Sequence, residues 1–168
     1  RTESDTEVLL HLYAEKGEAM LSELRGIFAF VLWDGRKQAM LLARDPYGIK
    51  PLYYADDGNT IRIASQVNAL LAGGNIDTSP EPAAHVGFYL LGSVPEPYTI
   101  YKGIRSLNPG STLWMDTYRR KSQHEFFNVG CEIEKAEEIG RDHNFGVDFD
   151  EMLREALIDS VRHHLISD

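Results

Sequence analysis

Cysteine is almost absent from this sequence, which has 168 residues and one cysteine, Cys131. A single thiol excludes an internal disulfide and any Cys-X-X-Cys motif. The lack of disulfides is typical of proteins from a reducing compartment. Long apolar runs are absent as well, because no run approaches the roughly 18 residues that a membrane-spanning helix requires. We therefore expect a cytoplasmic protein that makes no contact with a membrane.

Positive charge is in short supply. The sequence has 17 Lys and Arg against 26 Asp and Glu, a net charge of −9. A chain without an excess of bases is poorly suited to displace the counterions of a nucleic acid. The basic run at 119–121, Arg-Arg-Lys, is short and typical of a solvated turn. We expect no nucleic-acid partner.

Motifs that hold nucleotides or metals are also missing. The sequence contains no Gly-X-Gly-X-X-Gly, no P-loop, no His-Glu-X-X-His and no Cys/His cluster. Among its 6 histidines, the adjacent His163 and His164 would point to different sides of a helix, so they do not easily share one ion. We expect neither a metal nor a cofactor in this chain.

The sequence does contain 43% hydrophobic residues in short patterned runs, enough for one domain with a core. Ser4 and Glu7 have the spacing of a capping box at a helix start, and Gly17 suits the end of that helix. Residues 27–33 are apolar at every position, which predicts a strand that is buried on both faces and central in its sheet. Asp34-Gly35 then favours a hairpin turn. The remaining expected strands are 39–43, 52–55, 60–64, 111–116 and 125–129, and the remaining expected helices are 20–24, 67–71, 82–91 and 148–168.

Strands that follow one another as a meander between helices, without β-α-β alternation, predict an α+β fold. The charge is uneven, since residues 132–168 carry a net −7 and residues 1–131 a net −2. Residues 130–147 are acidic and lack periodicity, which is typical of a linker. After them, Asp148 and Glu151 can cap a helix with an apolar stripe. We therefore expect three segments, which are a domain at 1–129, an acidic linker at 130–147 and a helix at 148–168.

Asp5 and the segment 44–54 are the two candidates for chemistry. Asp5 stands in the first turn of the first helix, where a carboxylate stabilises the helix dipole by about 0.3–1 kcal/mol, and on the residues alone this structural role is favoured over ligand binding. Asp45 lies in the segment 44–54, whose two prolines and glycine fix a turn. Arg44 could pair with Asp45 there and Lys50 could face a pocket, although turn chemistry alone accounts for the pattern.

Cys131 is the one candidate thiol nucleophile. It lies at the edge of the acidic segment, where Glu132 and Glu134 disfavour the thiolate form. No base stands near it in the sequence. We therefore expect no catalytic residue in this chain.

Several motifs, taken in order, resemble one family. They are SDTEV at 4–8, LRGIFAFVLWD at 24–34, LLARDPYGIKPLYY at 41–54, IASQVNALL at 63–71 and VPEPYTIYKGIRSLNPGSTL at 94–113. The series resembles the glutamine amidotransferase domain of the asparagine synthetases, a class II amidotransferase of the N-terminal-nucleophile hydrolase type. LREALIDSVRHHLISD at 153–168 resembles the helix that opens the synthetase domain. Gln66 and Asn68 depart from the family, which usually has Glu and Lys at these positions.

The resemblance implies an incomplete fold of two packed antiparallel sheets with flanking helices. It also implies that the nucleophilic cysteine, the oxyanion donors and the ATP-binding loop lie in segments outside these residues. In such an enzyme the thiolate attacks glutamine, and the ammonia passes to an aspartate that is activated in a synthetase domain with ATP and Mg2+. Asp5 matches the family's aspartate that binds the α-amino group of L-glutamine, so with this resemblance the ligand role of Asp5 becomes the favoured one.

Other interpretations stay open. Related synthetases form other amides or a β-lactam, and a chain of this fold could instead be a non-catalytic scaffold. An unrelated α+β ligand-binding domain is a third interpretation. The resemblance further implies that this chain, a middle piece of a longer enzyme, is inactive alone. Its sheet edges would then be unpaired or would pair with a second copy in a homodimer.

Overall fold

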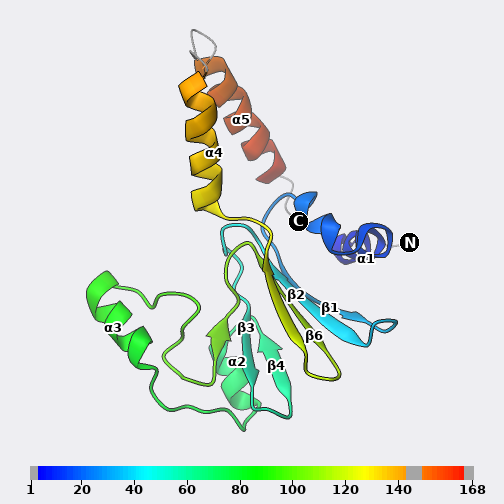
Figure 1. The fold of residues 1–168 in the computed structure, drawn as a ribbon, viewed down its shortest axis with the longest axis vertical. Coiled ribbons are helices and arrows are strands. Elements are labelled where there is room, and N and C mark those ends of the chain that lie inside the picture. The colour runs from blue at the N-terminus through cyan, green and yellow to red at the C-terminus, as the bar shows by residue number, and fades with distance from the viewer. Residues whose placement is uncertain (1–3, 143–148, 165–168) are drawn as a thin grey trace. The chain divides into compact units, whose positions relative to one another are not determined.

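The computed structural model of the protein describes residues 4–142 and 149–164. Its contacts divide the chain into two compact units. Residues 27–150 form the larger unit, which holds both β-sheets, and residues 1–26 with 151–168 form the smaller, helical unit (Figure 1).

The secondary structure largely follows the local sequence patterns. In chain order the elements are α1 (Asp5–Lys16), the 3-10 helix η1 (Gly17–Ser22), β1 (Ala29–Asp34), β2 (Ala39–Arg44), β3 (Tyr53–Asp56), β4 (Ile61–Ala64), α2 (Val67–Ala72), α3 (Pro82–Leu91), β5 (Arg105–Ser106), β6 (Ser111–Asp116), β7 (Lys121–Glu125), α4 (Val129–Asp142) and α5 (Phe149–His164). The expected helix 82–91 and strand 111–116 are confirmed at both ends.

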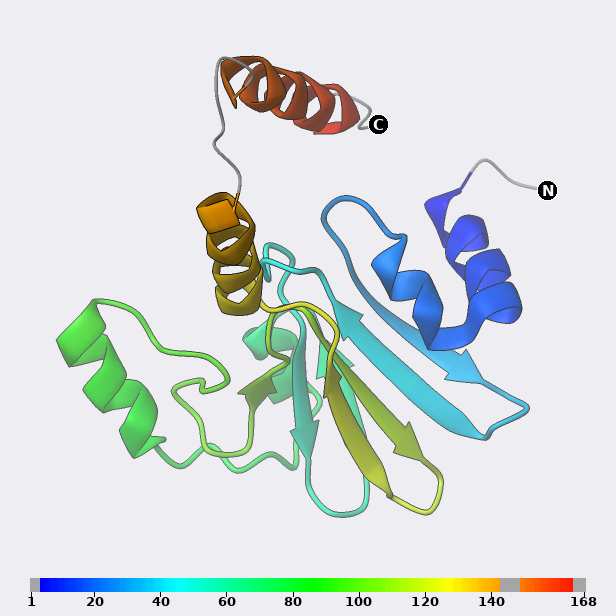
Figure 2. The ribbon, with the colours of Figure 1, turned by 45° about the horizontal axis from the view of Figure 1, so that its top comes forward.

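Two antiparallel sheets make up the larger unit. The first has the strand order β1-β2-β6-β7 and the second has the order β4-β3-β5, and all neighbouring strands are antiparallel. The hairpin expected at Asp34-Gly35 joins β1 to β2. The α+β fold with two antiparallel sheets and flanking helices is therefore confirmed (Figure 2).

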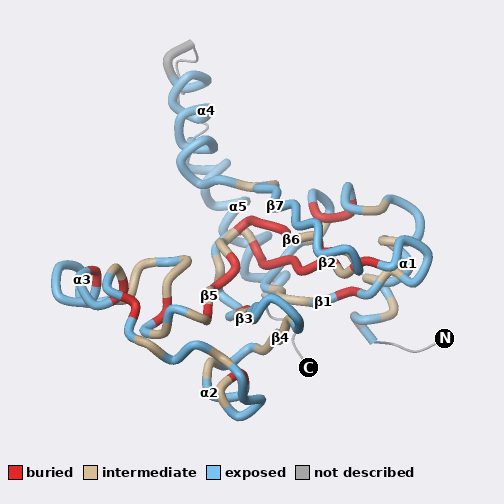
Figure 3. Tube along the Cα trace, turned by 60° about the horizontal axis from the view of Figure 1, so that its bottom comes forward, coloured by how far each residue is buried: buried red, intermediate tan, exposed pale blue. Residues whose placement is uncertain are grey.

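The core lies between the two sheets. Its buried members are Leu42, Leu52, Leu107, Leu113 and Met115. From the second sheet, Tyr54, Ile61 and Ile63 pack against this cluster. The opposite face of the second sheet holds a smaller cluster with α2, formed by Ala55, Leu70 and Ile104. Figure 3 shows the buried residues gathered along β2 and β6, the two inner strands of the first sheet.

The apolar run at 27–33 was expected as a central, doubly buried strand, and this prediction was wrong. β1 is an edge strand of its sheet. Leu32 is buried, whereas Val31 is 43% exposed and Trp33 is 55% exposed. Both exposed residues share the sheet face of Leu42, because directly paired residues lie on one side of a sheet. On that face the core between the sheets reaches Ala29 and no farther along β1.

The end of the larger unit also differs from expectation. β7 covers Lys121–Glu125 rather than 125–129, and its exposed polar residues give no apolar alternation by which to predict a strand. Residues expected as an aperiodic linker form α4 (Val129–Asp142). Asn128 caps this helix, since its side-chain oxygen accepts from Cys131 N at 3.3 Å. A helical spacing was present among the many acids, at Val129, Ile133, Ala136 and Ile139. The domain boundary itself stays a prediction.

The two long helices of the smaller unit agree with the sequence. Ser4 is the N-cap of α1, and its hydroxyl oxygen accepts from the backbone N–H of Thr6 at 3.3 Å. Gly17 ends the helix with φ 60°. α5 (Phe149–His164) confirms the expected C-terminal helix, and its described side chains are exposed. Asp148, the expected cap of this helix, lies outside the described residues.

Candidate functional site

Asp5, the predicted glutamine ligand, is the first residue of α1. It follows the N-cap Ser4 directly, so its backbone lies where the capping pattern predicts. The side chain of Asp5 lies outside the described part of the structure. Its proposed contact with the α-ammonium of glutamine therefore stays a prediction.

Arg44 is the best-anchored charge of the segment 44–54. It ends β2 with only 5% of the residue exposed. Its Nε donates to the carbonyl of Lys50 at 2.8 Å, and Nη2 donates to the carbonyl of Gly48 at 2.6 Å. Nη1 forms an ion pair with Glu96 at 2.6 Å. Among the described residues, Glu96 is thus the ion-pair partner of Arg44. The expected pairing of Arg44 with Asp45 was wrong.

Asp45 is 1% exposed and is held by backbone groups. Its carboxylate accepts three N–H groups at 3.0 Å each, those of Tyr47, Ile49 and Lys50. Its own backbone N donates to Phe28 O at 2.8 Å, and its carbonyl accepts from Gly110 N at 2.9 Å. Since these amides already surround the carboxylate, Asp45 fixes the turn and ties it to the segments before β1 and β6.

Gly48 is required at the centre of this turn. Its φ is 63°, and a Cβ there would lie 2.9 Å from Pro109 Cγ and 3.0 Å from Arg44 Cζ. The side chain of Lys50 is exposed and lines neither of the two cavities described below. The segment 44–54 is therefore organised as a structural turn around two buried charges, which favours turn chemistry over a pocket.

A second buried acid, Glu81, was not expected from the sequence. Glu81 is the N-cap of α3, and its side chain accepts from Ala83 N at 3.3 Å. The guanidinium of Arg105 donates to Glu81 at 2.7 Å and lies over the ring of Tyr98. This hydrogen bond is the main cause that lowers the pKa of Glu81. The dipeptide Glu81-Pro82 was a usable signal for a cap, because proline favours the first position of a helix.

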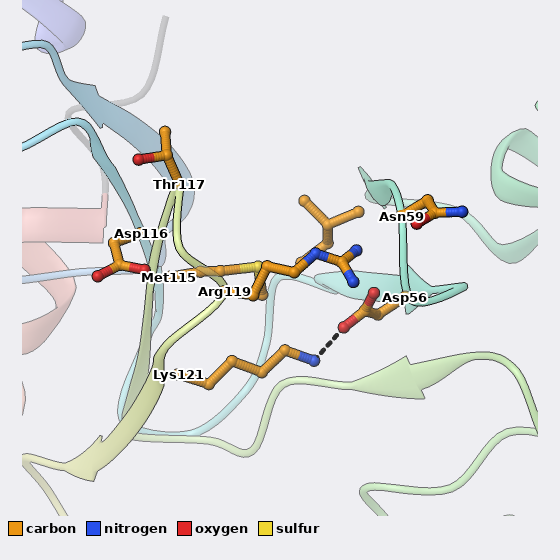
Figure 4. A pocket seen from close by; sticks show the side chains of 8 residues that line it. Asp56, Asn59, Met115, Asp116, Thr117, Arg119 and Lys121 are labelled. Atoms are coloured by element: carbon orange, nitrogen blue, oxygen red, sulfur yellow. Dashed lines mark hydrogen bonds and ion pairs between the residues drawn. The ribbon is translucent and has the colours of Figure 1, made fainter.

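A cavity of about 410 Å³ lies between the β3–β4 hairpin and the β6–β7 hairpin (Figure 4). It is lined by Asp56, Asn59, Ile61, Met115, Asp116, Thr117, Arg119 and Lys121. Lys121 forms an ion pair with Asp56, and its hydrogen bond is the main cause that lowers the pKa of Asp56. Arg119 and Arg120 lie in the exposed β6–β7 turn, as expected for the basic run, whereas Lys121 begins β7. Arg119 and Lys121 also line this cavity.

A second cavity, of about 330 Å³, lies beside the start of α4 and includes Glu96 and Asn128 in its lining. Cys131 is exposed on the same helix. Within residues 4–142 and 149–164, no three His, Cys, Asp or Glu side chains are grouped so that they could hold a metal ion. No helix in this part of the chain is both long enough and apolar enough to cross a membrane.

Comparison with known families decides the assignment of this fold. A family profile described as "Glutamine amidotransferase domain" matches residues 1–127. The chain belongs to this family. Both Asp5 and the segment 44–54 lie inside the matched residues, whereas α4 and α5 lie beyond them.

Curated relatives of this amidotransferase chain have two kinds of name. "Asparagine synthetase [glutamine-hydrolyzing] 1" of Bacillus subtilis is 34% identical over 99% of this chain and 25% of its own length. "Amidase chry2" of Gibberella zeae is 33% identical over 98% of this chain and 23% of its own length. The chain thus spans about a quarter of the length of these relatives.

A solved structure also resembles the amidotransferase chain. It is the glutamine phosphoribosylpyrophosphate amidotransferase of B. subtilis, complexed with ADP and GMP. The similarity covers 75% of this chain and 23% of that chain, with 25% sequence identity and a TM-score of 0.49.

Proposed function

We propose that this chain is part of an asparagine synthetase-like enzyme, in which it helps to release ammonia from glutamine for an amide-forming step. The observation that carries the proposal is the match of residues 1–127 to the glutamine amidotransferase domain. A glutamine-hydrolysing asparagine synthetase that matches 99% of the chain, with α4 and α5 included, supports the synthetase part.

The proposed chemistry divides between this chain and the rest of the parent enzyme. A cysteine thiolate from the parent attacks the side-chain amide carbon of glutamine, the C–N bond breaks, and ammonia leaves with an added proton. Water then hydrolyses the thioester to glutamate and restores the thiol. The ammonia passes to an aspartate whose carboxylate is activated in the synthetase domain, where ATP and Mg2+ are expected. Cytoplasmic location fits this metabolic role.

Asp5 is the residue of this chain that we place at the glutamine. A carboxylate at a fixed helix start can accept a charge-assisted hydrogen bond from the α-ammonium group. The loss of one partner from such a bond costs about 1.5–3 kcal/mol. Asp5→Asn in the parent enzyme should therefore raise the glutamine concentration needed for half-maximal rate by roughly ten- to hundred-fold.

The decisive measurement compares two nitrogen sources in the same variant. Synthesis from free ammonia should stay close to the wild-type rate, because that route bypasses the glutamine pocket. Asn can still occupy the start of a helix, so stability should change little. Glu15→Gln, which removes an exposed carboxylate near the other end of α1, is the matched control and should affect neither route. Equal losses with glutamine and with ammonia in Asp5→Asn would show a structural role only.

A second acceptor class is favoured by one observation. "Amidase chry2" and "Amidase chyE" of Penicillium rubens each match 98% of this chain, at 33% and 30% identity. Neither of these names refers to asparagine, and the second acceptor class that we propose is a carboxylate other than that of aspartate. The test assays the parent enzyme with glutamine, ATP and each of a panel of amino acids and other carboxylates. The carboxylates that are turned over distinguish aspartate from another acceptor. Turnover with aspartate alone would support the synthetase assignment.

A further inference from the structure

The cavity between the two hairpin turns joins a charged rim to the hydrophobic core. One wall comes from residues 56–61 of the second sheet, and the other comes from residues 115–121 of the first sheet. Its apolar lining consists of Ile61 and Met115, which belong to the core cluster between the sheets. An apolar surface within the larger unit is therefore reachable from solvent at this point (Figure 4).

The charges of the rim are not fully paired. Lys121 bonds to Asp56, and Arg120 pairs with Asp116 at 2.6 Å. Arg119 lines the cavity as well, but its guanidinium has neither a hydrogen bond nor an ion pair with the described residues. The charge of Arg119 acts on the Asp56 carboxylate from a distance, but Asp56 is bonded to Lys121, so the guanidinium of Arg119 keeps its donors available.

We propose that this cavity binds a small organic monoanion with a carboxylate head and an apolar body. The carboxylate would accept from the fork of Arg119, whose paired N–H groups match the spacing of the two carboxylate oxygens. The apolar body would cover Ile61 and Met115. A volume of about 410 Å³ lies within the range of roughly 300–1,000 Å³ that is typical of small-molecule sites.

The charge of the lining selects a monoanion over a phosphate. Asp56 and Asp116 both line the cavity, and the carboxylate of Asp56 lies close to Arg119 (Figure 4). A dianion would therefore gain the charge of Arg119 and would be repelled by the carboxylate of Asp56. A monoanion neutralises Arg119 without leaving an excess of negative charge. Because both carboxylates already have cationic partners, binding requires no break of an existing ion pair.

The test is an amide NMR titration of the 168-residue chain with 4-methylpentanoate, which has a single carboxylate and a branched apolar body. The neutral 4-methylpentanamide and inorganic phosphate serve as comparison ligands. We expect saturable shifts confined to residues 56–61 and 115–121 with the carboxylate, and weaker binding of the amide and of phosphate. Arg119→Gln should weaken binding of the carboxylate by about tenfold or more.

Arg36→Gln is the matched control, because Arg36 is an exposed turn arginine on the β1–β2 hairpin and does not line the cavity. This variant should bind as the unsubstituted chain does. The proposal is overturned if no saturable shifts occur, if acid and amide bind equally, or if both arginine variants lose the same affinity. Tighter binding of phosphate would overturn the assigned ligand class. None of these readouts requires glutaminase activity.

Discussion

Buried charges are stable only where polar groups surround them, and Arg44 and Asp45 meet this need in different ways. Arg44 combines a carboxylate with backbone carbonyls, whereas Asp45 relies on backbone amides. Three backbone amides occupy most of the roughly four acceptor sites of the Asp45 carboxylate. Replacement by a side chain of equal size therefore tests the charge and the acceptor count without altering the volume.

We predict that Asp45→Asn lowers the free energy of unfolding by about 1.5–3 kcal/mol, because the amide replaces an acceptor with a donor that faces backbone N–H groups. Asp34→Asn is the control. Asp34 also accepts from two turn amides, those of Arg36 and Lys37, but it is less buried and Asn suits a hairpin turn. Urea denaturation of both variants gives the comparison. A similar cost at the two positions would contradict the role given to burial.

Single residues could be predicted from the sequence where their partners are close along the chain. The capping of α1 by Ser4 and the end at Gly17 involve neighbours within a few positions. The pairing of Arg44 with Glu96 spans 52 positions, and no local pattern contains such information. The sequence therefore indicated the turn at 44–54 and its two charges, whereas their burial was not predicted and the expected partner of Arg44 was wrong.

At the scale of elements, β1 shows how a uniform apolar run can mislead. Every residue at 27–33 is apolar, yet burial differs between neighbours because the strand lies at the edge of its sheet. The composition of the run indicates only how buried the strand is on average, whereas the position of the strand in the sheet determines the burial of each residue. For the same reason α4 was not predicted, because its many acids outnumber the apolar residues that have helical spacing. β7 was not predicted at its observed position, because it is polar throughout.

The two faces of β1 should respond differently to truncation. Leu32→Ala should cost about 2–5 kcal/mol, because it leaves a cavity around a side chain that is 7% exposed. Val31→Ala should cost less than about 1 kcal/mol, because Val31 is 43% exposed. Thermal or urea unfolding measures both. Equal costs would instead support the doubly buried strand that the sequence predicted.

At the scale of the whole molecule, several carboxylates are stabilised in their charged form. Arg105 lowers the pKa of Glu81, Lys121 lowers that of Asp56, and Arg62 lowers that of Asp57, in each case chiefly through a side-chain hydrogen bond. A carboxyl group whose pKa is lowered by folding stabilises the folded state above its ordinary pKa. That contribution is lost as the pH falls through the folded value.

We therefore predict that the chain begins to lose stability as the pH falls below about 5. The loss should continue below the ordinary values of 3.8 for Asp and 4.5 for Glu, because the pKa values of these groups are lowered in the folded state. Arg105→Gln should be less stable than the unsubstituted chain at neutral pH and should lose less on acidification, because the pKa of Glu81 would return toward 4.5. Chemical denaturation at a series of pH values measures, for both proteins, how the free energy of unfolding changes with pH. If the free energy of unfolding changes with pH in the variant as it does in the unsubstituted chain, Glu81 does not contribute to the acid sensitivity.

We also predict that the polypeptide of these 168 residues releases no ammonia from glutamine. Its one thiol, Cys131, is exposed on a helix and lines neither of the two cavities described above, so neither of these cavities could hold glutamine against it. A coupled assay for ammonia, run beside the parent enzyme, measures this. Release that Cys131→Ala abolishes would contradict both the prediction and the assignment of the nucleophile to the parent.

The polar contacts around the turn at 44–54 also bear on the order in which the chain assembles. Hairpins such as β1–β2 close over a few residues and form within microseconds. The bonds from Arg44 to Glu96 and to Leu107 span 52 and 63 positions, so their loop-closure entropy must be overcome first. Long-range closures of this kind slow folding. The amides that hold Asp45 lie within five positions of it and are available early, whereas the anchoring of Arg44 is a late event. A nascent chain therefore carries the charge of Arg44 hydrated until residue 107 and its neighbours are available.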